Sequence, residues 1–68
     1  IGYLESFYHR SIEVALRLSG FDVEPEVPLK VDFRGFNVGD FRADLVVERK
    51  VIVEIKVADE IVIYILDS

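Results

Sequence analysis

The second half of this sequence consists of short apolar segments with polar breaks of only a few residues between them. Residues 29–33 alternate apolar and charged side chains, which is the period-two pattern of a half-buried strand. Residues 41–47 and 51–57 predict two further strands, separated only by the polar segment 48–50. Residues 61–66 are uncharged and apolar and favour a fourth strand. We therefore expect an antiparallel sheet of three to four strands joined by short turns.

A helix is predicted at residues 2–19, ahead of these strands. Apolar residues recur there at helical spacing, at Leu4, Tyr8, Ile12, Ala15 and Leu16. Gly20 follows, and glycine accepts the left-handed conformation found just after helices. Residues 21–28 contain two prolines, so we expect a linker or at most an edge strand, because proline cannot donate to a ladder. The order of elements predicts an α+β fold in which the helix covers one face of the sheet.

The length of 68 residues allows one small domain, which buries only about 60% of the surface that its unfolded chain exposes. Domains of this size usually need a disulfide, a metal or a partner chain, and the sequence contains no cysteine. We therefore expect a bound metal or a homo-oligomer, the latter through the exposed strand at residues 61–66. The lack of cysteine also fits a cytoplasmic location. No signal peptide or membrane-spanning segment is recognisable, so no membrane partner is expected.

The residues that suggest a chemical function lie on the two neighbouring strands predicted at residues 41–47 and 51–57. Glu54 and Lys56 point to the same face of their strand, because successive side chains alternate. If residues 48–50 form a three-residue loop, Asp44 lies directly opposite Glu54, with Cβ atoms about 5 Å apart. A two-residue loop would instead place Asp44 against Ile55, on the wrong face.

Two facing carboxylates repel each other, and a divalent cation would compensate for the repulsion. On this hypothesis Asp44 and Glu54 bind Mg²⁺, with Mn²⁺ as a substitute. Lys56 then activates water or stabilises the charge that grows on a phosphate, which suits phosphodiester hydrolysis. Without metal, the repulsion predicts that Glu54→Ala raises the stability. Glu5 lies on the inward arc of the helix, where a carboxylate needs a partner, so we expect it to assist at the metal.

Simpler interpretations stay open for the same residues. The three strand residues would also form an ordinary solvated face with a cross-strand salt bridge. Glu5 would also pair with His9 or Arg42, and His9 itself is expected on the surface. Arg42 either contacts a phosphate or neutralises Asp44.

Two motifs together resemble a known family. They consist of Gly2, Glu5 and Tyr8, which spell GxxExxY, and of Asp44, Glu54 and Lys56, which spell D-(x)9-ExK. In this order they resemble the GxxExxY family of PD-(D/E)XK nuclease-like proteins. Residues 26–29 and 38–45 also resemble the intervening strands of that family, so the likeness covers roughly residues 2–60.

The resemblance implies a single nuclease-like domain over residues 1–68, with a partial restriction-endonuclease-like αβββ core. It also implies Mg²⁺-dependent cleavage of nucleic acid. Asp44 and Glu54 are then metal ligands, Lys56 is catalytic, and Glu5 is the helix carboxylate that assists the metal. The net charge of −5 argues against a basic nucleic-acid coat protein but is compatible with an enzyme that meets its substrate through metal ions.

The sequence departs from the family pattern after Lys56. Family members continue into a second helix, whereas residues 61–66 favour a strand and the chain ends at Ser68. We therefore expect the second core helix to be missing. Because the chain begins with Ile1 and contains no methionine, we also expect it to be a fragment. The alternative function is an inactive remnant or a small oligomeric interaction module that keeps the fold without catalysis.

Overall fold

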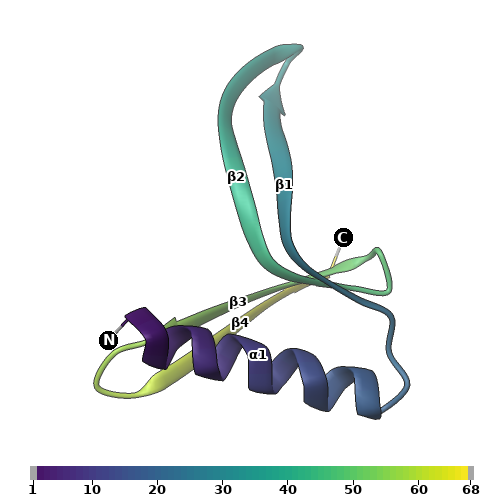
Figure 1. The fold of residues 1–68 in the computed structure, drawn as a ribbon. Coiled ribbons are helices and arrows are strands. Elements are labelled where there is room, and N and C mark those ends of the chain that lie inside the picture. The colour runs from purple at the N-terminus through teal and green to yellow at the C-terminus, as the bar shows by residue number, and fades with distance from the viewer. Residues whose placement is uncertain (1, 68) are drawn as a thin grey trace.

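The computed structural model describes residues 2–67, which form one helix followed by four strands (Figure 1). The elements are α1 (Gly2–Leu18), β1 (Val23–Phe33), β2 (Phe36–Val47), β3 (Val51–Val57) and β4 (Ile61–Asp67). The strands form one antiparallel sheet in the order β1-β2-β3-β4, so each strand pairs with its neighbour in sequence. The predicted α+β fold, with a partial αβββ core and a fourth strand, is confirmed.

The helix α1 ends within one residue of the predicted position. The Gly20 N–H donates to the Arg17 carbonyl (3.0 Å), and the Phe21 N–H donates to the Leu16 carbonyl (3.1 Å). Gly20 has a φ of 94°. This pair of hydrogen bonds around a left-handed glycine is the Schellman motif, which satisfies carbonyls that the last helical turn leaves free.

The first two strands are longer than the sequence predicted. β1 begins at Val23 rather than at residue 29, and β2 begins at Phe36 rather than at residue 41. β1 contains Pro25 and Pro28 but forms one edge of the sheet, where proline is tolerated. The prediction was too short because apolar alternation is interrupted in both strands, whereas pairing along their whole length supplies the backbone hydrogen bonds.

Part of the β1–β2 hairpin leaves the sheet as a two-stranded arm. The ladder between β2 and β3 ends at the pair Leu45 and Val53, while β1 and β2 stay paired as far as Phe33 and Phe36. In Figure 1 this hairpin rises away from the layer formed by α1, β3 and β4. We refer to residues 27–42 as the arm.

The core lies between α1 and the strands at the base of the arm. Its buried members are Val23, Leu45, Val47, Val53 and Ile55, against which Ile12, Leu16, Val51 and Val57 pack. Because Val53 and Ile55 face the helix, the alternation of β3 turns Glu54 and Lys56 away from it. β4 pairs with β3 along its full length but leaves most of its apolar side chains exposed. Among the residues described here, no helix is long and apolar enough to cross a membrane.

Glu13 is a buried acidic residue that the sequence analysis did not single out. Arg10 donates to its Oε1 at 3.0 Å, and Arg17 Nε donates to its Oε2 at 3.1 Å. Arg17 also donates to the carbonyl of Val23, which ties the helix to the start of β1. Burial alone would raise the pKa of the Glu13 carboxyl, but the hydrogen bonds and charges of Arg10 and Arg17 outweigh it and hold that pKa below 4.5.

We expect Glu13→Gln to lower the free energy of unfolding by about 1–2 kcal/mol at pH 7, because charge-assisted hydrogen bonds become neutral ones. A carboxyl whose pKa is lowered by folding stabilises the fold above its unfolded pKa. That contribution disappears as the pH falls through the lower, folded pKa. The stability difference in urea denaturation should therefore shrink below about pH 4.5. Glu24→Gln, at an exposed position of β1, is the control. A difference unchanged down to pH 3 would contradict this account.

Candidate active site

The turn between β2 and β3 determines which residues meet across the two strands. Val47 pairs with Val51 and Leu45 with Val53, so residues 48–50 form the turn. The predicted three-residue loop is therefore confirmed, although it contains no glycine. Glu48 and Arg49 supply the left-handed backbone instead, with φ values of 56° and 55°.

Contacts with the helix–β1 connection hold this turn. The Glu48 N–H donates to the Asp22 carbonyl at 2.7 Å, and the Glu48 carboxylate accepts a hydrogen bond from the Asp22 N–H. Within the turn, the Lys50 N–H donates to the Val47 carbonyl at 3.1 Å. Left-handed φ values at non-glycine residues persist where surrounding contacts impose them, and these hydrogen bonds are such contacts.

The carboxylates of Asp44 and Glu54 each accept a backbone hydrogen bond from the opposite strand at the point where β2 separates from β3. The Asp44 N–H donates to Glu54 Oε2 at 2.7 Å, and the Ile55 N–H donates to Asp44 Oδ2 at 2.8 Å. Both side chains are half-buried. Each carboxylate therefore accepts a backbone N–H of the opposite strand one or two residues beyond the end of the ladder, where buried N–H groups need new acceptors.

The two backbone donors change the expected balance of charge at this site. From the sequence, a divalent cation is the expected compensator for the repulsion between the carboxylates. In the structure, a hydrogen bond from a backbone N–H to each carboxylate already offsets part of it. These bonds use Oδ2 of Asp44 and Oε2 of Glu54, and a carboxylate offers about four lone-pair directions. Both groups therefore keep acceptor capacity for a metal ion.

The backbone also bends beside this pair. Pro25 pairs with Leu45 and Val27 with Ala43, but Glu26 and Asp44, which lie between them, are not paired. Glu26 has a φ of 53°. Arg42 Nη1 lies 3.8 Å from Glu26 Oε1, with both side chains more than two-thirds solvent-exposed. An exposed pair of this kind contributes little to stability. Arg42 thus approaches Glu26 rather than Glu5.

The helix places His9 beside Asp44, so the expectation of a surface histidine was wrong. His9 Nε2 lies 3.3 Å from the Ile55 carbonyl oxygen and 3.8 Å from Asp44 Oδ2. Its side chain is 24% exposed. The missed signal is helical spacing: His9, Ile12, Glu13 and Leu16 follow the i, i+3, i+4, i+7 pattern of one helix face. The face that meets the sheet therefore carries two polar residues.

A hollow of about 320 Å³ opens next to Asp44, between α1 and the base of the arm. Its lining consists of Ser6, His9, Arg10, Glu13, Pro25, Glu26, Asp44 and Leu45. Asp44 is the one predicted site residue in this lining. The hollow gives a solvent path to the carboxylate from the helix side.

The other two predicted site residues, Lys56 and Glu5, lie on β3 and α1. Lys56 is exposed on β3, two residues after Glu54 and on the same face. Glu5 is half-buried near the start of α1. Among residues 2–67, no group of three His, Cys, Asp or Glu side chains is placed to share a metal ion. The structure therefore brings Asp44 and Glu54 together but does not bring Glu5 to them.

Comparison with protein-family models matches residues 1–64 to the PD-(D/E)XK nuclease superfamily. The match covers nearly the whole chain, and the chain therefore belongs to this superfamily. Neither the search of curated proteins nor the search of solved structures found a match.

The hydrogen bonds of the pair reverse the expected effect of removing Glu54. We expect Glu54→Ala to lower the free energy of unfolding by about 1–2 kcal/mol in metal-free buffer, because the half-buried Asp44 N–H loses its acceptor. Glu54→Gln removes the charge but keeps an acceptor oxygen, so it should retain most of the stability. Urea denaturation of both variants in EDTA checks this. A more stable Glu54→Ala variant would show that repulsion between the carboxylates dominates.

Proposed function

We propose that this domain hydrolyses phosphodiester bonds of nucleic acid, with Mg²⁺ held by Asp44 and Glu54. The observation that supports this most strongly is the pair of carboxylates at the separation of β2 and β3, each oriented by a hydrogen bond from a backbone N–H of the opposite strand. The donor set fits Mg²⁺, which is commonly held by one or two carboxylates together with waters and substrate phosphate. When bound, the ion polarises a phosphoryl oxygen and makes its bound water more acidic.

Each remaining residue has a role in this proposal that follows from its place. Lys56 stands in solvent on the same face as Glu54, where its ammonium group stabilises the charge that develops on the phosphate. His9 lies against Asp44 Oδ2 and the Ile55 carbonyl, where it helps to fix the orientation of the carboxylate. Among the described residues, Glu5 does not belong to a group of three possible ligands. In this proposal it therefore acts from the helix through a water molecule or the substrate and does not bind the ion directly.

Within the superfamily, we propose that the chain belongs to the GxxExxY family. The support is sequence spacing: Gly2, Glu5 and Tyr8 form the first motif, and Asp44 precedes the ExK of β3 by nine intervening residues. Gly2, Glu5 and Tyr8 lie within α1, and Asp44, Glu54 and Lys56 lie in β2 and β3.

We expect calorimetric titration to detect Mn²⁺ binding by the wild type, with binding at least about tenfold weaker in Asp44→Ala. Asp59→Ala is the matched control, because Asp59 lies in the exposed β3–β4 turn and should not affect binding. An absence of binding to the wild type would mean that the domain keeps the superfamily fold as an inactive remnant or interaction module. Equal binding by wild type and Asp44→Ala would place the metal elsewhere.

We expect Lys56→Ala to reduce the Mg²⁺-dependent cleavage of a labelled oligonucleotide by about 100-fold or more, while Mn²⁺ binding is retained. The positive charge that Lys56 contributes is needed for the reaction and not for ligation of the ion. Lys50→Ala, another exposed lysine at one end of β3, is the control for loss of surface charge. Cleavage at the wild-type rate by Lys56→Ala would remove this lysine from the mechanism.

A further inference from the structure

The tip of the arm exposes two phenylalanines that the proposed chemistry does not use. Phe33 and Phe36 pair across the turn and are 62% and 75% exposed. Arg34 and Gly35 form the two-residue turn between them, with φ values of 51° and 85°. The Arg34 guanidinium lies 5.3 Å from the centre of the Phe33 ring. Exposed aromatic groups gathered on a projecting hairpin mark a surface that binds something.

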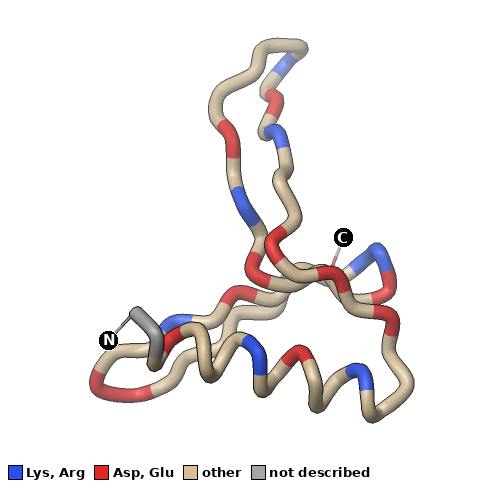
Figure 2. Tube along the Cα trace, in the orientation of Figure 1, with Lys and Arg blue, Asp and Glu red and all other residues tan. Residues whose placement is uncertain are grey.

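The charge of the arm differs from that of the rest of the chain. Residues 27–42 contain three basic and two acidic residues, whereas the remaining residues contain five basic and eleven acidic ones. The arm therefore carries a net charge of +1 and the remainder a net charge of −6. Figure 2 shows basic segments spaced from the base of the arm to its tip. The net negative charge of the remainder repels a polyanion, whereas the arm is the part with a net positive charge.

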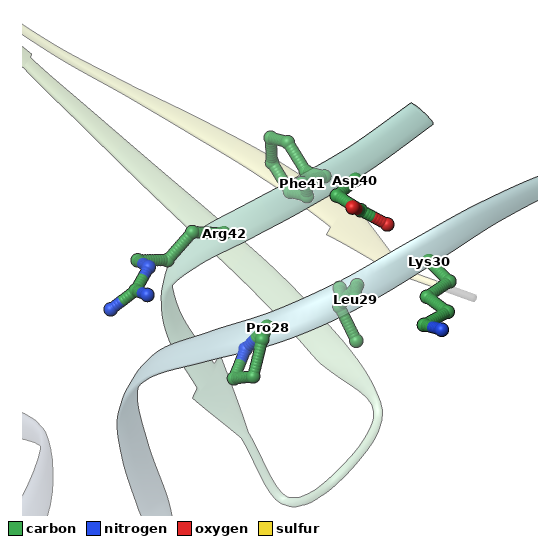
Figure 3. Close-up of a pocket in the computed structure, with 6 residues that line it drawn as sticks. All are labelled: Pro28, Leu29, Lys30, Asp40, Phe41 and Arg42. Carbon is green, nitrogen blue, oxygen red and sulfur yellow. The ribbon is translucent and has the colours of Figure 1, made fainter. Parts of the chain in front are cut away.

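The side of the arm also combines apolar surface with positive charge. A hollow of about 470 Å³ is lined by Pro28, Leu29, Lys30, Asp40, Phe41 and Arg42. In Figure 3, Arg42 extends from β2 at one end of this group and Lys30 from β1 at the other, with Pro28 and Leu29 between them. Apolar and aromatic surface between cations matches a chain of unpaired bases joined by phosphates.

We propose that the arm binds a single-stranded segment of the nucleic-acid substrate. Bases stack on Phe33 and Phe36, while phosphates contact Arg34 and Lys30. This inference rests on the proposed function, because it names the substrate class of the same site. Arg42 and Asp44 are two residues apart on β2, so a strand that follows the arm reaches the carboxylate pair. Unpaired bases are favoured over a duplex because the arm offers rings for stacking but only three cations.

The direct test is fluorescence anisotropy with a labelled single-stranded oligonucleotide of about 12 nucleotides and the corresponding duplex, in EDTA so that no cleavage occurs. We expect the wild type to prefer the single strand. The Phe33→Ala/Phe36→Ala double variant should bind it about tenfold more weakly or worse, because base stacking is lost. Phe7→Ala is the matched control, since Phe7 is 61% exposed on α1, away from the arm. Because all three rings are exposed, these variants should keep the wild-type circular dichroism spectrum.

A pair of arginine variants tests the contribution of charge. Arg34 and Arg49 are both exposed and both occupy left-handed turn positions, with φ values of 51° and 55°. Arg34→Gln should weaken binding and reduce the slope of log affinity against log salt concentration by about 0.7, as expected for one lost phosphate contact on a single strand. Arg49→Gln should leave both unchanged. Equal effects of the two variants would overturn the assignment of the arm.

Hydrolysis of bis(p-nitrophenyl) phosphate separates this inference from the proposed function, because the compound is too small to reach the tip. The Phe33→Ala/Phe36→Ala variant should hydrolyse it at the wild-type rate. Arm-dependent binding without hydrolysis by any variant supports the arm inference and overturns the proposed function. Undiminished oligonucleotide binding by the double variant, no binding by the wild type, or equal affinity for duplex overturns the arm inference. The arm inference is also overturned if the wild type is a dimer, the double variant is a monomer and both bind the oligonucleotide equally, because the phenylalanines then serve the dimer contact.

Discussion

Two hydrogen bonds at the divergence of β2 and β3 connect the shape of this molecule to its candidate chemistry. The Asp44 N–H donates to Glu54, and the Ile55 N–H donates to Asp44. Side-chain carboxylates take the place of backbone acceptors there, so β2 can turn away without leaving these N–H groups unsatisfied. The same hydrogen bonds hold both carboxylates at this junction. The arm therefore leaves the sheet at the same place where Asp44 and Glu54 come together.

A small number of buried residues and hydrogen bonds support this junction. Among the residues whose burial the structure describes, six apolar side chains are buried and five of them form one cluster. Arg17, which donates to Glu13, also donates to the Val23 carbonyl and so joins α1 to β1. Such a core leaves much of β4 and the arm in solvent. A small domain buries a smaller fraction of its surface than a large one, so few residues outside its centre are buried. The buried cluster lies at the base of the arm, while Phe33 and Phe36 are exposed at its tip.

Most local features followed from the sequence, and their differences from the structure have physical causes. α1 ends one residue earlier than predicted, and β3 has the predicted bounds. β1 and β2 extend further than predicted, because pairing of two strands sustains segments that lack apolar alternation. His9 and Glu13 were missed as inward residues because polar side chains on a helix suggest solvent. Here a carbonyl, a carboxylate and two arginines supply their partners.

The sequence by itself determined the α+β order and the meeting of Asp44 with Glu54. Both depend on short-range rules: side chains alternate along a strand, and a three-residue turn sets the register of a hairpin. Only the tertiary structure decided where β2 leaves β3, which N–H groups compensate the carboxylates, and that His9 lies beside them. These depend on contacts between residues far apart in the chain, such as His9 with Ile55 and Asp22 with Glu48. Helical spacing puts His9 on the face of α1 that meets the sheet, but the residues that it meets there depend on how α1 docks, which no local pattern encodes.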